Sequence, residues 1–136
     1  MTHHQTGFAS RTVVFIILGV GAFLAIAVML LPDGFSDDLS KIGQGTATVV
    51  LTHDNSSVGS LDVMTLLNKV RSDYAGKIEF LVVNVNTREG QIFRQQQNVD
   101  AIVLVFFSSN GKKLGTISHT MNETELRSVL DKLSFE

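Results

Sequence analysis

An uncharged run of twenty residues near the N-terminus constrains this chain more than any other feature. Residues 12–31 read TVVFIILGVGAFLAIAVMLL. As a helix, about twenty residues extend about 30 Å, which matches the hydrocarbon core of a bilayer. A signal peptide usually has an apolar region of only about 7 to 15 residues, followed by a small-x-small cleavage site. The run therefore predicts one retained transmembrane helix over residues 12–31, after a short N-terminal tail at residues 1–11.

Charge on the two sides of this run indicates its orientation. Arg11 directly precedes the run, whereas the first Lys after it is Lys41. Since Lys and Arg near the ends of a membrane helix set its direction, we expect a cytoplasmic N-terminus and a C-terminal domain on the opposite side. Within the run, Gly21 and Ala25 form a Gly-x-x-x-Ala step that permits close approach of a second membrane helix, although Gly and Ala are common in any such helix.

The next segment, residues 32–45 (PDGFSDDLSKIGQG), mixes Asp, Ser and Gly with isolated apolar residues and has no sustained period. Such a composition predicts a linker, short enough to keep the following domain near the membrane. Its Phe35, Leu39 and Ile42 allow a brief helical turn or packing on a neighbour. Residues 46–136 then form one domain of about 90 residues, which is enough for an independent core.

Charge balance excludes some partners of this domain. The chain has 11 Lys and Arg against 13 Asp and Glu. Nucleic acids and anionic membrane surfaces attract a basic face, so neither is an expected partner. The lipid bilayer is an expected partner only through the helix at residues 12–31.

Within the domain, strand and helix patterns alternate. β-Branched and apolar runs predict strands, whereas helices are indicated by apolar residues at helical spacing, by Ser60 as a cap, by Gly76 as a terminator and by Asn122 with Glu125 as a capping box. The strands are expected at residues 46–52, 77–86, 101–107 and 113–118, and the helices at 60–76, 87–98 and after Asn122. The order β-α-β-α-β-β-α predicts an α/β fold with crossover helices and a C-terminal hairpin.

Four local strings suggest a known family. They are YAGKIEF at residues 74–80, VNVN at 83–86, VDAI at 99–102 and NGK at 110–112. With the preceding apolar run, they make the chain resemble the membrane-anchored thioredoxin-like proteins that face the bacterial periplasm or the thylakoid lumen. The resemblance implies a thioredoxin-like fold and a domain in one of these two compartments.

The redox site that the resemblance implies falls on substituted positions. The two cysteines correspond to Ser57 and Ser60, and the buried acid corresponds to Leu51. The cis-proline corresponds to Val103, or to Ile102 if the loop gap is placed differently. Disulfide exchange needs a thiolate, and the sequence contains no Cys. A dithiol oxidoreductase is therefore excluded, and we expect a redox-inactive domain that is not an enzyme.

Other chemistry is weakly indicated. His53 and Asp54 lie just before Ser57 and Ser60, but a Ser-His-Asp triad is defined by geometry and also needs an oxyanion hole. Loop and cap roles explain these serines more simply. An enzyme would require a pocket that unites His53 with Ser57 or Ser60. The four histidines, at positions 3, 4, 53 and 119, show no metal-ligand spacing, and we expect neither a metal nor a cofactor nor a small-molecule ligand.

Two functions remain. The favoured one is a non-catalytic interaction module, an accessory or assembly subunit of a respiratory or photosynthetic membrane complex. The alternative is a chaperone-like binder of extended client segments, which a groove beside the lost cysteines would hold by backbone pairing. The candidate binding residues are His53, Asp54, Ser57, Val58, Ser60, Ile102 and Val103.

Overall fold

A computed structural model describes residues 8–29, 34–118 and 121–135. The chain divides into two compact units, with the boundary between Gly34 and Phe35. His3, His4 and His119 lie outside the described residues, as do the last two positions of the predicted membrane helix and the first two of the predicted linker.

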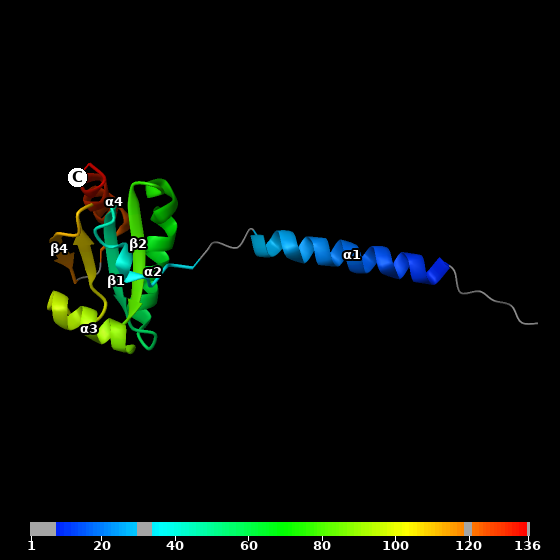
Figure 1. Ribbon diagram of the computed structural model, residues 1–136, viewed down its shortest axis with the longest axis horizontal. Coiled ribbons are helices and arrows are strands. Elements are labelled where there is room, and N and C mark those ends of the chain that lie inside the picture. The colour runs from blue at the N-terminus through cyan, green and yellow to red at the C-terminus, as the bar shows by residue number, and fades with distance from the viewer. Residues whose placement is uncertain (1–7, 30–33, 119–120, 136) are drawn as a thin grey trace, which may run out of the picture. The chain divides into compact units, whose positions relative to one another are not determined.

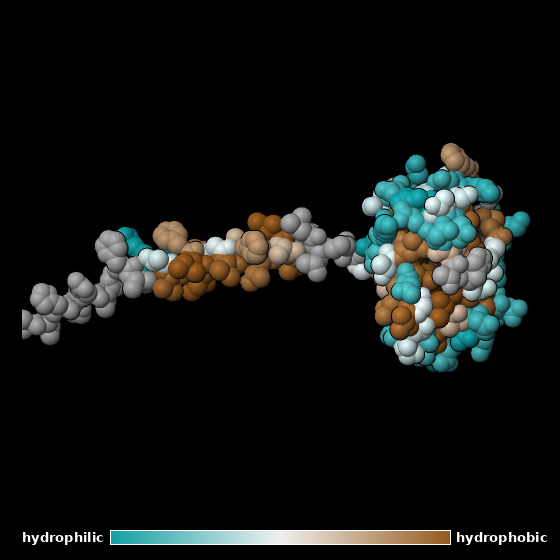
Figure 2. Space-filling model, turned by 180° about the vertical axis from the view of Figure 1, so that it is seen from behind, coloured by the Kyte–Doolittle hydropathy of each residue, from teal (hydrophilic) through white to brown (hydrophobic). Residues whose placement is uncertain are grey.

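The first unit is the helix α1 (Phe8–Met29). Its part from Arg11 to Met29 is long and apolar enough to cross a membrane. Figure 2 shows hydrophobic side chains along most of this helix. Gly21 and Ala25, four residues apart, lie one above the other on α1, and a side chain added at Gly21 would meet no atom within 4 Å.

The second unit is a four-stranded sheet with helices on both faces (Figure 1). Its strands are β1 (Ala47–His53), β2 (Ile78–Asn84), β3 (Leu104–Phe107) and β4 (Lys113–Ile117). Its helices are α2 (Val58–Val70), α3 (Arg88–Gln97), α4 (Glu123–Leu133) and the 3-10 helices η1 (Leu39–Lys41) and η2 (Arg71–Tyr74). The strand order is β2-β1-β3-β4, in which β1 is parallel to β2 and antiparallel to β3, and β3 is antiparallel to β4. The predicted order of elements is confirmed.

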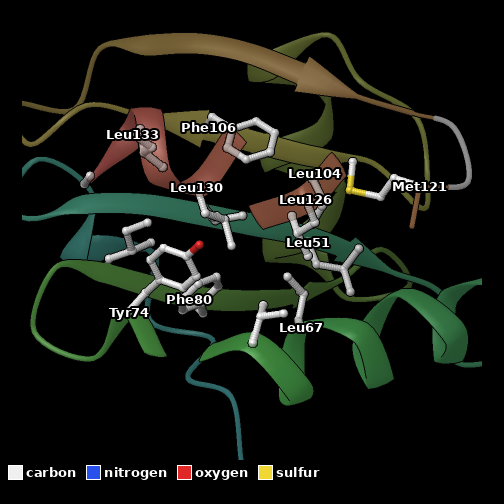
Figure 3. Packing of buried hydrophobic residues seen from close by; sticks show 14 residues of the cluster. Leu51, Leu67, Tyr74, Phe80, Leu104, Phe106, Met121, Leu126, Leu130 and Leu133 are labelled. Atoms are coloured by element: carbon white, nitrogen blue, oxygen red, sulfur yellow. The ribbon is translucent and has the colours of Figure 1, made fainter. Parts of the chain in front are cut away.

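Burial explains why β1 takes the central position. All of its seven residues are buried, because side chains from both of its faces enter apolar cores. On one face, Leu51 lies among Leu67, Leu104 and Leu126, under α2 and α4 (Figure 3). On the other face, Val50 packs in a second cluster that contains Phe93 of α3. A strand covered on both faces reads as a continuous apolar run.

Two predicted boundaries are wrong. Ser60 does not cap α2: Ser57 holds the N-cap position, and Ser60 is buried inside the first turn. The third strand begins at Leu104 and not at residue 101, because Ile102 has a φ of 61°, which interrupts extended backbone. The predicted capping box is confirmed, since Asn122 and Glu125 form it at the start of α4.

Residues 35–45 differ from the predicted linker. The O atom of Ser36 accepts a hydrogen bond of 2.9 Å from the N–H of Val82, which adds a bridge to the outer edge of β2. Lys41 pairs with Glu79 at 2.6 Å, and the N–H of Gly45 donates to Ser109 O at 3.0 Å. This segment, called the strap below, therefore belongs to the folded unit, which begins at Phe35 and not at residue 46.

Side chains of the strap also reach both cores. Phe35 packs against the cluster under α2 and α4 and stacks on the guanidinium of Arg71, 4.5 Å from its ring centroid. Leu39 and Ile42 pack against the cluster under α3. These single contacts leave no period in the sequence, which is why the strap resembles a linker there.

Candidate functional site

The predicted site residues come from three segments that meet at one end of the sheet. β1 ends at His53, α2 begins after Ser57, and the loop at residues 101–103 enters β3. The N–H of Ile102 donates to Thr52 O at 2.7 Å, so the loop is fixed directly on the end of β1. The functional candidates therefore lie at the carboxyl end of the central strand, beside the start of a helix.

His53 and Ser60 form a closed pair at this end. Ser60 Oγ lies 2.6 Å from His53 Nδ1 and accepts a hydrogen bond of 3.0 Å from the N–H of Asp54. A hydroxyl can both donate and accept, so Ser60 Oγ forms a hydrogen bond with Nδ1 in either tautomer of His53. Ser60 is fully buried and His53 is 7% exposed. The Ser60 hydroxyl is thus satisfied within the fold and has no open path to a substrate atom.

Asp54 points into the loop that follows β1. Its carboxylate accepts hydrogen bonds from the hydroxyl and the N–H of Ser56, at 2.7 and 3.0 Å, and a weaker one of 3.4 Å from Asn86. These bonds, the Ser56 hydroxyl first, hold the pKa of Asp54 below its usual value. The carboxylate shapes the loop and forms no hydrogen bond with the His53 ring, so His53, Asp54 and Ser60 are not arranged as a catalytic triad.

Thr52 organises the loop that faces α2, although the sequence did not single it out. Its Oγ1 donates to Asp100 O at 2.9 Å and accepts from the N–H of Val103 at the same distance. Its backbone N–H donates to Val103 O at 3.0 Å. A fully buried Thr at the end of an apolar strand was the available signal, because a buried hydroxyl needs partners.

Ile102 takes a backbone conformation that β-branched residues rarely adopt. Its φ of 61° lies in the left-handed region, which costs an L-residue about 1–2 kcal/mol. The hydrogen bonds of Thr52 Oγ1 with Asp100 O and with the N–H of Val103 hold it there, and no peptide bond in the described residues is cis. The strain directs the Ile102 side chain toward Gly59, whose missing Cβ would lie 3.9 Å from Ile102 Cδ1.

A groove of about 460 Å³ opens between α2 and this loop. Its lining is mostly apolar and includes several residues that the sequence did not identify as candidates. The lining residues are Gly59, Asp62, Val63, Leu66, Ala101, Ile102, Ser118 and Met121. The N–H and C=O of Ala101 take part in no hydrogen bond in the part of the chain that the structure describes. The groove thus combines apolar side chains with backbone groups that remain available for pairing.

The predicted binding residues divide into three groups. Ile102 lines the groove, and Ser57 and Val58 lie at the adjoining start of α2, where Val58 is 74% exposed. His53, Asp54 and Ser60 hold the loop in place behind the groove. Val103 and Leu51 are buried in the cores on opposite faces of the sheet, so neither lies in the groove.

This arrangement is suited to binding. A nucleophile must approach a substrate carbon, which the buried Ser60 hydroxyl does not do. Among the described residues, no three His, Asp or Glu side chains are close enough together to hold a metal ion.

Comparison with known proteins identifies the fold. No protein-family model and no curated protein matches this sequence. Among solved structures, an uncharacterized thioredoxin-like protein from Clostridium perfringens is similar, with a TM-score of 0.65 and 14% identity over 73% of this chain and 79% of that chain. The structure of a malarial protein aligns with a TM-score of 0.55 and 17% identity, over 65% of this chain and 97% of that chain. The second unit therefore has a thioredoxin-like fold, as the resemblance implied.

Proposed function

We propose that this protein is a redox-inactive, membrane-anchored binding module, and that its groove beside Gly59 and Ile102 holds an extended apolar segment of a partner protein. α1 spans the membrane once, and the domain works on the non-cytoplasmic side as an accessory or assembly subunit of a membrane complex. The carrying observation is that the positions expected for two reactive thiols hold a half-buried Ser57 and a buried Ser60, beside an apolar groove with open backbone groups.

The chemistry of the groove supports an extended apolar occupant. Val63, Leu66 and Met121 supply apolar contact, and Asp62 is the only charged residue in the lining. The free N–H and C=O of Ala101 match the backbone groups of a strand-like segment, which gives affinity for many sequences. The resemblance to proteins of the periplasm and thylakoid lumen supports the compartment.

The test is capture of the partner from native membranes. A photoreactive residue replaces Asp62 in the groove, and a control replaces Gln96 on the exposed surface of α3, both in the full chain. After irradiation in the native membrane, mass spectrometry identifies the attached proteins. We expect specific adducts from position 62 and none from position 96. Equal adducts from both positions would refute the groove as the binding site.

A matched pair of substitutions tests the same groove without cross-linking. Ile102→Asn keeps a residue that tolerates the left-handed backbone but removes the apolar side chain. Ile92→Asn makes the same chemical change on α3, at a side chain that is 44% exposed. Ile102→Asn should lower partner recovery by about fivefold or more, since loss of an interface anchor commonly costs more than about 1 kcal/mol. Ile92→Asn should bind as wild type.

The relative amounts of the captured proteins distinguish a complex subunit from a chaperone-like binder. A complex subunit co-purifies with one set of proteins in fixed proportion. A chaperone-like binder, which the open backbone of Ala101 favours, captures several clients in small and varying amounts. Quantitative mass spectrometry of the position-62 adducts decides between them.

A further inference from the structure

The two outer edges of the sheet, formed by β2 and β4, differ in whether their outer backbone groups are paired. The edge of β2 is bridged by Ser36 of the strap, so part of its outer backbone is already paired. The edge of β4 carries no further strand or bridge among the described residues. An open edge presents unpaired N–H and C=O groups that pair readily with another strand.

Most of β4 lacks the features that usually prevent an edge strand from pairing with another chain. Edge strands are commonly guarded by charged residues and bulges. In β4 both guards lie at the start of the strand: Lys113 is its only charged residue, and the β3–β4 ladder passes from the pair Phe107–Lys113 to the pair Phe106–Gly115, so that Leu114 is the extra residue at the irregularity. The rest of the strand, residues 114–117, is uncharged. Leu114 is 43% exposed there.

A shallow apolar cavity adjoins this edge. It has a volume of about 240 Å³ and is lined by Phe106, Leu114, Gly115, Thr116, Ile117, Val129, Lys132 and Leu133. Gly115 pairs with Phe106, and a side chain at Gly115 would meet no atom within 4 Å. The missing side chain therefore leaves open space at the edge beside the half-exposed Leu114, and a second molecule at the edge would fill it.

We propose that β4 is a self-association edge, and that two copies of this chain pair their β4 strands antiparallel about a two-fold axis at Gly115. In this register Lys113 of one copy faces Ile117 of the other, and Leu114 faces Thr116. The two Lys113 side chains do not oppose each other in this register, so two β4 strands can pair without repulsion between like charges. The paired strands join the two four-stranded sheets into one continuous sheet.

Anchoring favours the pairing. Copies that carry the same membrane helix share one plane, which raises their effective concentration far above that of a freely diffusing domain. A five-residue edge, too weak for a stable dimer in dilute solution, is then sufficient. This inference is independent of the groove, because the edge and the groove share no lining residue.

The absence of Cys in the sequence permits a direct test. Opposed residues of antiparallel strands have Cα atoms about 4.5–5.5 Å apart, within the range that a disulfide bridges. Full-length Gly115→Cys in its native membrane, treated with a mild oxidant, should therefore become mostly a disulfide-linked dimer that a reductant reverses. Asn68→Cys, on the exposed surface of α2, is the control for random collision and should remain monomeric. Equal cross-linking of the two variants would overturn the proposal.

Two further experiments test the register in which the β4 strands pair and the association of the chain without any introduced Cys. Leu114→Cys and Thr116→Cys on differently tagged copies should form mixed disulfides at least about tenfold more often than either variant forms with itself, as the pairing distances require. Without any Cys, Leu114→Lys with Thr116→Lys places like charges opposite each other and should convert a two-chain particle, extracted within a patch of its native bilayer, to one chain. The charge-matched control, Asn68→Lys with Gln96→Lys on exposed helix surfaces, should retain two chains. A one-chain wild-type particle that also lacks the Gly115→Cys cross-link would refute the edge.

Discussion

At position 60 this chain has the hydroxyl oxygen of a serine where the resemblance implies the sulfur of a cysteine. The resemblance to thioredoxin-like proteins puts a thiol there, and in this chain a hydroxyl binds the N–H of Asp54 and the ring of His53 instead. A hydroxyl forms stronger hydrogen bonds than a thiol and is a far weaker nucleophile at neutral pH. On the proposed function, the Ser60 hydroxyl has a structural role, and its contribution should appear in the stability of the domain.

Replacing Ser60 tests this role. Ser60→Ala leaves Asp54 N–H and His53 Nδ1 without a partner in a buried place, which should reduce the free energy of unfolding by about 1–3 kcal/mol. Ser57→Ala is the control, because the Ser57 side chain makes no capping hydrogen bond, and it should cost clearly less. Urea denaturation of residues 35–136, which carry their own core, measures both. Equal losses would contradict the structural role of the Ser60 hydroxyl.

Some features of the candidate site could be predicted from the sequence, and others depend on contacts between distant residues. Counting along the family's pattern pointed to Ser57, to Ser60 and to Val103 or Ile102. In the structure the two serines lie at the start of α2, and residues 102 and 103 lie in the loop before β3. The 2.6 Å contact of Ser60 with His53 depends on how a helix turn packs on a strand end, which spacing alone does not give. The left-handed Ile102 is set by the hydrogen bonds of Thr52; a Thr at the end of an apolar strand indicates that its hydroxyl needs partners, but not which residues those partners are.

Among the elements, α3 packs directly against the backbone of the sheet at its first turn. A side chain at Gly90, in its first turn, would overlap the carbonyl of Asn84 at the end of β2. Thr87 caps the same turn, because its side chain accepts a hydrogen bond of 3.1 Å from the N–H of Gly90. The predicted start of this helix at residue 87 agrees with the N-cap position of Thr87, whereas the role of Gly90 is visible only when the helix is placed on the sheet.

Gly90→Ala should reverse the usual effect of this substitution. In an exposed helix interior, Ala stabilises by about 1 kcal/mol relative to Gly. At Gly90 the backbone of α3 must shift away from Asn84, and we expect a loss of about 1–3 kcal/mol instead. Gln91→Ala, one residue later and exposed, should change stability by less than about 0.5 kcal/mol. A thermal midpoint for Gly90→Ala at or above that of wild type would show that α3 does not approach β2 so closely.

The strap is the element that periodicity missed, and shortening the domain tests it. Chains beginning at Phe35 and at Thr46 should differ in unfolding free energy by at least about 2 kcal/mol, because Phe35, Leu39 and Ile42 lose partly buried apolar surface. A chain beginning at Gly34 should equal the one beginning at Phe35. Denaturant midpoints measure all three, and equal stability without the strap would restore the linker interpretation.

In the whole molecule, a helix suited to a bilayer precedes a domain with its own core. The periodic patterns that sequence reveals, an apolar run, buried strands and amphipathic helices, predicted this plan because each depends on burial repeated over many residues. The direction of insertion depends on few charges, Arg11 before the helix and Lys41 well after it.

A reporter fused after Glu136 tests that direction. If Arg11 retains the N-terminus in the cytoplasm, a reporter that works only outside the cytoplasm should be active, and a cytoplasmic reporter should be silent. Arg11→Glu with two Lys inserted after Pro32 reverses the charge difference and should raise the opposite signal. Cytoplasmic activity of the unaltered fusion would place the domain and its partners on the other side.

The strap also decides where a pull on the anchor enters the domain. Any tension between membrane and domain reaches Phe35 and Ser36 first, at one aromatic contact and one backbone bridge on the rim of the sheet. These contacts open one after another, whereas the ladder that joins β1 to β2 would have to yield as a whole. If α1 anchors the domain as proposed, a bending membrane would therefore pull the strap away from the sheet before it disturbed β1, the central strand beside the groove.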